Sequence, residues 1–325
     1  MPTTISDRRI PLAAIRDAEA AIYRAAVRTP LVHLAAETTP GVELYLKLEA
    51  LQPIGSFKIR GAYNVVRQLS PRDLAEGVWT VSAGNAAQGV AYAAREVGAR
   101  CSVMVIDTAP QTKVKAIERL GASIVPVSYD EAWQTVESHA SDRMRGHFVH
   151  PFDDDQFIAG NATIGLEILE DLPDVDAIVA PLGGGGLLSG IAAAVRELRP
   201  ATRVYAAEPE TAAPLAVSLA AGRPMSFEKW QASFVDGAGG KSVLPRMWPL
   251  LAQLSGSIVV SLDEVARAMK LAAERAHVIA EGAASCAIAA ATSGRAGGGR
   301  VVAVVSGGNI DLAKFAALVG ACSER

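Results

Sequence analysis

The stretch "DAIVAPLGGGGLLSG", residues 176–190, leads from a continuously apolar run into a helical pattern through four consecutive glycines. A continuously apolar run of this length is typical of a strand that is buried on both faces of a parallel sheet. Four glycines are a costly way to begin a helix unless the backbone must approach another group closely. Successive N–H groups at the start of a helix form a cradle for a phosphate. The stretch therefore predicts an α/β fold with a phosphate site where this strand ends.

Strand-length apolar runs alternate with helix-length segments along the rest of the chain, which predicts a doubly wound α/β architecture. In such sheets ligands bind beyond the carboxyl ends of the strands. We interpret "HPFDDDQF", residues 150–157, as a crossing between two lobes. The helix at 262–280 has the clearest start, a capping box of Ser261 and Glu264. The other predicted helices are 112–120, 130–144, 156–170 and 187–198, and the predicted strands are 43–48, 78–82, 101–106, 123–127, 147–149, 176–181, 203–208, 257–260 and 301–305.

The composition is that of an ordinary globular protein of 325 residues with a net charge of −3. No block of Lys and Arg points to nucleic acid or to an anionic membrane, and no apolar run approaches the roughly 20 residues of a membrane helix. The first ten residues lack the apolar core of a signal peptide. The three cysteines are far apart, which predicts neither a disulfide framework nor a CxxC metal site. We expect a cytoplasmic protein that binds neither nucleic acid nor a membrane.

Three further motifs have polar side chains where a predicted strand or loop is followed by a helix. They are Lys58 in "QPIGSFKIRGAYN" (52–64), Ser82 and Asn85 in "SAGNAAQG" (82–89), and Ser306 in "VVAVVSGGNIDL" (301–312). A lone lysine is most often a solvated surface residue, and a lone serine after a strand is often a helix cap. A buried lysine, however, has a lowered pKa and can form Schiff bases. Together with a phosphate cradle, Lys58 indicates pyridoxal 5'-phosphate as a cofactor.

Taken in order, "GSFKIRGA", "SAGNAAQG", "PLGGGGLLSG" and "SGGN" resemble the motifs of the fold type II pyridoxal-phosphate enzymes, within the threonine/serine dehydratase and serine racemase branch. The resemblance implies a fold like that of tryptophan synthase β, an α/β protein with two open, mainly parallel sheets and helices on both faces. It implies a large cofactor-binding domain of residues 1–67 and 149–325. It also implies a small domain of residues 68–148, which carries the loop that binds the substrate carboxylate.

The same resemblance implies a role for each matched residue. Lys58 would hold the cofactor as a Schiff base and act as the catalytic base, with Phe57 against the pyridine ring. Asn85 would donate to the phenolic oxygen, and Ser306 would face the pyridine nitrogen, where a neutral hydroxyl suits β-elimination. The phosphate would be bound by Gly183, Gly184, Gly185, Gly186 and the N–H group of Leu187. The substrate would be bound by the loop of Ser82, Ala83, Gly84, Asn85 and Ala86.

By this resemblance the reaction is β-elimination of water from a β-hydroxy-α-amino acid, which yields a 2-oxo acid and ammonia. Racemases of this family tend to carry a second serine, their acid/base on the opposite face of Cα, where this chain has Ala83. Many dehydratases have a histidine where this chain has Ala86, which opens volume beside the substrate. We therefore expect a substrate bulkier than threonine, such as 3-phenylserine or a hydroxyectoine-derived compound.

The segment "AAEPETAAP", residues 206–214, resembles the cation loop of the family. The expected ligands of a monovalent or divalent cation are Glu208 and a carbonyl near Ala212. Relatives often place a further acid where this chain has Pro214. The resemblance also implies a homodimer or a homotetramer.

Other functions are compatible with the same residues. Within the family these are serine racemisation and β-replacement. From another class, an NAD-dependent Rossmann oxidoreductase would explain the glycines and would use Glu208 to bind a ribose, but it would leave "GSFKIRGA" and Ser306 unexplained. A non-catalytic ligand-binding protein is a further alternative, which the presence of Lys58 disfavours.

Overall fold

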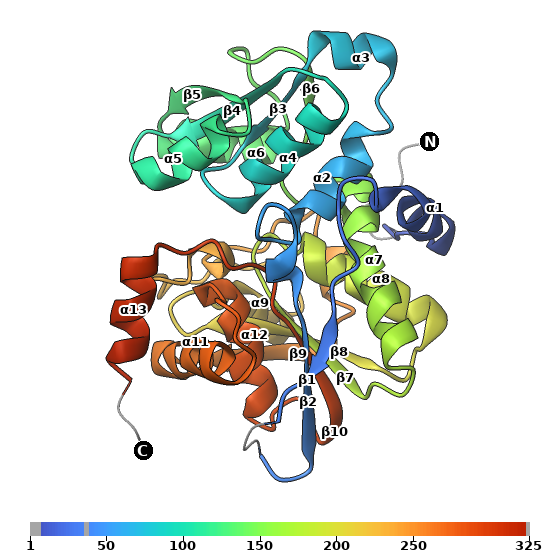
Figure 1. Ribbon diagram of the computed structural model, residues 1–325, viewed down its shortest axis with the longest axis vertical. Coiled ribbons are helices and arrows are strands. Elements are labelled where there is room, and N and C mark those ends of the chain that lie inside the picture. Colours follow the sequence, from blue (N-terminus) through green and yellow to red (C-terminus); the bar gives the residue numbers. More distant parts are fainter. Residues whose placement is uncertain (1–7, 36–38, 323–325) are drawn as a thin grey trace.

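The chain forms two lobes, each built on its own mainly parallel sheet (Figure 1). The computed structural model describes residues 8–35 and 39–322. In these ranges the large lobe contains a six-stranded sheet in the order β1-β2-β10-β7-β8-β9, and the small lobe a four-stranded sheet in the order β5-β4-β3-β6. The large sheet consists of β1 (Leu31–His33), β2 (Val42–Lys47), β7 (Ala177–Pro181), β8 (Arg203–Pro209), β9 (Gly256–Val260) and β10 (Gly299–Val304). The small sheet consists of β3 (Val78–Val81), β4 (Cys101–Ile106), β5 (Ser123–Val127) and β6 (His147–Phe148).

Helices cover both faces of the large sheet. Strand β7 is buried along its whole length, as the continuously apolar run predicts. Ile178 and Ala180 pack on one face with α7 (Asp155–Asp171) and α8 (Gly186–Leu198). Ala177 and Val179 pack on the other face with α11 (Leu262–Arg275) and α12 (Gly282–Thr292). Alternate residues of one strand thus belong to two different hydrophobic cores.

The small sheet is covered in the same way. Val103 and Val105 pack with α4 (Asn85–Glu96) and α5 (Gln111–Glu118), whereas Met104 faces α6 (Tyr129–Ser138). Helix α2 (Lys58–Val66) packs against α4 of the small lobe and against α7 of the large lobe, so it lies at the junction of the two lobes. The remaining elements are α1 (Leu12–Ile22), α3 (Pro71–Glu76), α9 (Pro214–Ala221), α10 (Trp248–Leu251), α13 (Leu312–Gly320) and the short 3₁₀ helices η2 (Glu49–Leu51) and η3 (Asp236–Ala238).

The structure confirms the capping box that starts α11. The Ser261 hydroxyl accepts from the Glu264 N–H group, and the Glu264 carboxylate accepts from the Ser261 N–H group. The helix ends at Arg275, earlier than the predicted residue 280, because His277 adopts a left-handed conformation with φ of 56°. The predicted crossing at 150–157 ends at Asp154, which caps α7 by accepting from the Phe157 N–H group. Among the described residues, no helix is long and apolar enough to cross a membrane.

A buried ion network lies beneath the first turn of α2. The fully buried Arg60 guanidinium donates to Glu49 at 2.8 Å and to Glu167 at 2.6 Å. Lys47 lies 2.6 Å from the same Glu167 carboxylate. Buried charges are tolerated when each has a partner. Through Arg60, two residues after Lys58, the network therefore fixes the first turn of α2 to β2, η2 and α7.

Candidate active site

A cavity of about 530 Å³ lies between the two lobes, where β3, β7 and β10 end. This is the place where ligands bind in open parallel sheets. The structure brings all four sequence motifs together in its lining, although they are far apart in the chain. The lining includes Phe57, Lys58, Ser82, Ala83, Gly84, Asn85, Ala86, Gly183, Gly184, Gly185, Gly186, Leu187 and Ser306.

Lys58 is the first residue of α2, and its amine is packed within protein while its side chain borders the cavity. The amine donates to the Pro151 carbonyl oxygen at 2.6 Å and lies 5.2 Å and 5.3 Å from the ring centroids of Phe57 and Phe157. Burial lowers the pKa of Lys58 to about 8, although the negative charge of Glu281 opposes this shift. A neutral amine is therefore far more populated at neutral pH than in an exposed lysine, as a nucleophile or base requires.

The glycine loop leaves its backbone donors free. In the described part of the chain, the N–H groups of residues 183–188 donate to no acceptor. A Cβ atom on Gly184 would lie 2.2 Å from the Phe152 ring, and one on Gly183 would lie 2.7 Å from the Gly237 carbonyl oxygen. Gly185 has a φ of 94°, which favours glycine. These features, at the start of the 13-residue helix α8, fit an anion such as a phosphate.

The loop of residues 82–86 leads from β3 into α4. The Ser82 hydroxyl accepts from the Gly84 N–H group at 3.1 Å, so this N–H group already has a partner. The N–H groups of Ala83, Asn85 and Ala86 have no acceptor among the described residues. Free donors at the start of a helix suit a carboxylate.

Asn85 is held in one orientation by two neighbours. Its Nδ2 atom donates to Glu281 at 2.8 Å, and its Oδ1 atom accepts from Asn309 at 2.8 Å. Asn309 in turn donates to the Ile54 carbonyl oxygen at 2.8 Å. An amide has two N–H groups, so Asn85 keeps one donor for a ligand in the cavity.

Glu281 is a functional candidate that the sequence motifs missed. It lines the cavity and is 8% exposed. Burial raises the pKa of Glu281 to about 7, with the nearby Asp236 acting in the same direction and the Asn85 hydrogen bond opposing it. A buried carboxyl group that titrates near neutral pH in a cleft is typical of catalytic sites. Only an acidic residue just before an Ala-rich segment marks it in the sequence, which is too common a feature to single it out.

The "SGGN" motif closes the site from the carboxyl end of β10. The Ser306 carbonyl oxygen accepts from the Phe57 N–H group at 3.0 Å, and Gly308 donates to Gly55 at 2.9 Å. A Cβ atom on Gly307 would lie 2.7 Å from the Glu281 carboxylate, so glycine is required for this close approach. Residues 306–309 thereby hold the loop before Lys58 and the Asn85–Glu281 pair in one place.

Glu208 and Ala212 do not line the cavity, and the structure gives Glu208 three hydrogen-bond donors. Its carboxylate accepts from the N–H groups of Leu215 and Ala216, at 2.8 Å each, and from the Ser257 hydroxyl. Leu215 and Ala216 lie in the first turn of α9, where a carboxylate is stabilised by the helix dipole. Burial nevertheless raises the pKa of Glu208. The cation at Glu208 and Ala212 stays a prediction.

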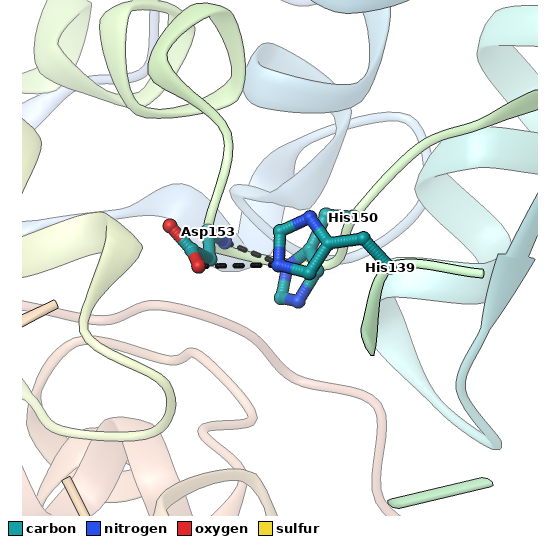
Figure 2. Close-up of side chains that lie close together, drawn as sticks. All are labelled: His139, His150 and Asp153. Atoms are coloured by element: carbon teal, nitrogen blue, oxygen red, sulfur yellow. Dashed lines mark hydrogen bonds and ion pairs between the residues drawn. The ribbon is translucent and has the colours of Figure 1, made fainter. Parts of the chain in front are cut away.

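His139, His150 and Asp153 form a cluster in which one ligand atom of each residue could face a metal ion (Figure 2). The structure explains these contacts without a metal. His150 Nδ1 accepts from the N–H groups of Phe152 and Asp153, at 3.2 Å and 2.7 Å, and burial lowers the pKa of His150 to about 3.

Asp153 is already neutralised by ion pairs with Arg8 and Arg246. Burial opposes ionisation of Asp153, but the charges of Arg8 and Arg246 outweigh it and hold the pKa of this carboxyl group below its usual range. His139 Nε2 lies 3.3 Å from Asp153 without a well-aligned hydrogen bond. We therefore interpret the cluster as a joint between the small lobe and the crossing that follows β6.

A buried lysine with a lowered pKa and a glycine loop with free N–H groups line one cavity. This arrangement suits an enzyme that holds its cofactor both through a lysine amine and through a phosphate group. The family described as pyridoxal-phosphate dependent enzyme matches residues 22–307. The chain belongs to this family. The free N–H groups of the glycine loop and the buried amine of Lys58 fit pyridoxal 5'-phosphate.

Named relatives and solved structures agree with this assignment. The L-threonine ammonia-lyase of Thermotoga maritima is 38% identical over 309 residues, which cover 93% of this chain and 76% of the relative. A maize serine racemase structure has a TM-score of 0.87 at 31% identity and covers 95% of this chain and 96% of its own. The processed form of threonine deaminase isoform 2 from Solanum lycopersicum has a TM-score of 0.82 at 32% identity, covering 95% and 93%.

Proposed function

We propose that this protein converts a β-hydroxy-α-amino acid into a 2-oxo acid and ammonia. The observation that carries the proposal is the Lys58 amine, buried with a lowered pKa beside the glycine cradle. Relatives at 37% and 38% identity are named L-threonine ammonia-lyases. In the overall reaction Cα loses its proton and Cβ its hydroxyl group, and one water then replaces the nitrogen, so that ammonia is the net leaving group.

Lys58 is the residue that exchanges protons with the substrate. Pyridoxal phosphate, when bound, supplies an electron sink for the pair of electrons left at Cα. The Lys58 amine accepts the Cα proton, because a pKa lowered to about 8 leaves more of the neutral amine near neutral pH than in an exposed lysine. The Pro151 carbonyl oxygen, 2.6 Å from the amine, orients it.

Three groups prepare the site for this step. The free N–H groups of Ala83, Asn85 and Ala86 bind the substrate carboxylate together with the Ser82 hydroxyl. Asn85, in an orientation fixed by Glu281 and Asn309, would donate its remaining N–H group to the phenolic oxygen of the cofactor. Ser306, in the cavity lining, would offer the pyridine nitrogen a neutral hydroxyl group, which favours elimination over transamination.

The substrate carries a side chain bulkier than that of threonine, such as 3-phenylserine or a hydroxyectoine-derived compound. Support comes from Ala86, a buried small residue in the cavity lining where related dehydratases have histidine. Ala83 lies where racemases carry their second acid/base, and a methyl group cannot return a proton to the opposite face of Cα. Dehydration is therefore favoured over serine racemisation, and β-replacement is the remaining alternative within the family.

Some parts of the proposal rest on the resemblance: a cation at Glu208 and Ala212, a homodimer or homotetramer, and domain boundaries near residues 68 and 148. A cytoplasmic location rests on the composition and on the first ten residues. The NAD-dependent alternative loses its support because the chain belongs to the pyridoxal-phosphate family and because three donors already occupy Glu208.

The experiment that tests the proposal is a steady-state panel of β-hydroxy-α-amino acids, assayed for ammonia and for the 2-oxo acid. Release of both products in equal amounts supports β-elimination. A change of optical rotation without ammonia would assign the protein to racemisation instead.

A further inference from the structure

A second, smaller cavity of about 150 Å³ opens beside the substrate loop of the small lobe. We call it the α6 subsite, and its walls are Met104, Ile106, Tyr129, Ala132, Trp133 and Val136. Tyr129, Ala132, Trp133 and Val136 come from α6, and Met104 and Ile106 from the facing strand β4. We propose that the α6 subsite binds an uncharged substituent on the Cβ atom of the substrate, of about the size of a phenyl ring.

The α6 subsite adjoins the active-site cavity. Ser82, Ala83 and Val136 line both of them, and the larger cavity also contains Lys58. A substrate whose carboxylate lies on the 82–86 loop therefore has its side chain within reach of α6. The subsite starts at the residues that hold the amino acid, not at a distant surface.

The walls of the subsite select an apolar group. Among the described residues, the lining includes no charged side chain. Trp133 also lines the subsite. Its indole N–H group donates to Glu137 at 2.9 Å, so this donor is already used. Ala132 and Val136 are each 8% exposed and belong to the same hydrophobic cluster as Met104. A charged substituent would lose its hydration there, and none of the described lining side chains carries a charge that could pair with it.

The size of the subsite selects a bulky group. An apolar protein cavity of about 150 Å³ is large enough to hold benzene. The methyl group of threonine would leave most of this volume without contacts, whereas a phenyl group would fill it. A single methylene group in a hydrophobic pocket changes kcat/KM by about 10- to 200-fold. The subsite thus favours a β-aryl substrate over threonine.

The inference rests on the proposed function, and filling the subsite tests it. Replacing Ala132 with Leu adds three carbon atoms to the wall. We expect the ratio of kcat/KM for 3-phenylserine to that for threonine to fall at least about tenfold. The matched control is Ala140→Leu, which adds the same atoms at an exposed position just beyond α6.

A second variant keeps the subsite testable if the first one misfolds, and an unreactive ligand measures binding apart from the rate of the reaction. Trp133→Ala removes the aromatic wall from a partly exposed position, and we expect the same ratio to fall. L-Phenylalanine lacks the leaving hydroxyl group, and its inhibition constant against threonine should rise at least about tenfold in both subsite variants but not in the control.

The outcomes separate the two proposals. Ammonia from both substrates with an unchanged ratio and unchanged inhibition in Ala132→Leu and Trp133→Ala would overturn the subsite and leave the proposed function intact. Absence of ammonia from every β-hydroxy amino acid with the unaltered holoenzyme would overturn the proposed function itself. A fall in the ratio that is confined to the subsite variants supports both.

Discussion

The Asn85 amide donates to the Glu281 carboxylate at 2.8 Å, although 196 positions separate the two residues in the chain. This bond joins the start of α4 in the small lobe to the residue before α12 in the large lobe. Both residues lie in the lining of the cavity between the lobes, and the bond fixes the direction of the Asn85 side chain. The position of a proposed cofactor-binding residue on one lobe thus depends on a buried acid on the other.

Glu281→Gln should change how stability depends on pH in the cofactor-free protein. Because the pKa of Glu281 is raised from 4.5 to about 7, the folded state binds more protons than the unfolded state between these pH values. The free energy of unfolding should therefore fall as the pH rises through this window, by up to about 3 kcal/mol from this group. Urea unfolding from pH 5 to about pH 8 checks this.

The glutamine variant lacks the titrating group, so its curve should fall less over the same range. Glu118→Gln is the matched control, because Glu118 is an exposed acid of α5 outside the cavity lining, and its curve should follow that of the unaltered protein. Parallel curves for the unaltered protein and Glu281→Gln would contradict the assignment of a raised pKa to Glu281.

Lys58→Ala should remove the cofactor Schiff base and lower turnover by more than about a thousandfold, because both nucleophile and base are lost. The absorbance of the bound cofactor and the rate of ammonia release measure the two effects. Lys115→Ala, at an exposed position of α5, is the control and should behave like the unaltered protein. Normal turnover by Lys58→Ala would exclude Lys58 as the catalytic residue.

Gly184→Ala should weaken binding of pyridoxal phosphate. The new Cβ atom would lie 2.2 Å from the Phe152 ring, so the loop must move and its N–H groups lose their common direction. The loss of one charge-assisted hydrogen bond raises a dissociation constant by about 10- to 100-fold. A fluorescence titration of the cofactor-free protein measures it.

The comparison for that titration is Gly320→Ala, in α13, where an added Cβ atom meets nothing within 4 Å. Its dissociation constant should equal that of the unaltered protein. Equal affinity in Gly184→Ala would show that the loop does not hold the phosphate.

Arg60→Met should destabilise the protein by about 3–5 kcal/mol, because it leaves the buried Glu49 and Glu167 carboxylates without their main partner. Chemical denaturation gives the change in the free energy of unfolding. Arg72→Met removes an exposed pair with Glu76 in α3 and should cost less than about 1 kcal/mol. Equal effects of the two substitutions would mean that the network beneath α2 contributes no special stability.

Much of the site follows from local sequence. The glycine loop, Lys58 and Ser306 each lie where a strand or loop meets a helix, and short-range pattern is enough to find them. Parallel topology then brings these strand ends to one edge, which is why separate motifs share one cavity.

What the sequence patterns missed depends on tertiary contacts. Helix α12, "GAASCAIAAAT", is buried on nearly every side and so lacks an amphipathic period that would mark it as a helix. Strand β1 has three residues and forms only through its antiparallel pairing with β2. The pKa of Glu281 is raised by burial between elements that are distant in the chain, and the residues next to it in the sequence do not indicate that burial.

The reaction itself is tested most directly by the stoichiometry of products from 3-phenylserine and threonine with the unaltered holoenzyme. We expect one ammonia and one 2-oxo acid for each substrate molecule consumed, with a higher kcat/KM for 3-phenylserine. Consumption without ammonia, or no consumption of any β-hydroxy-α-amino acid, would contradict it.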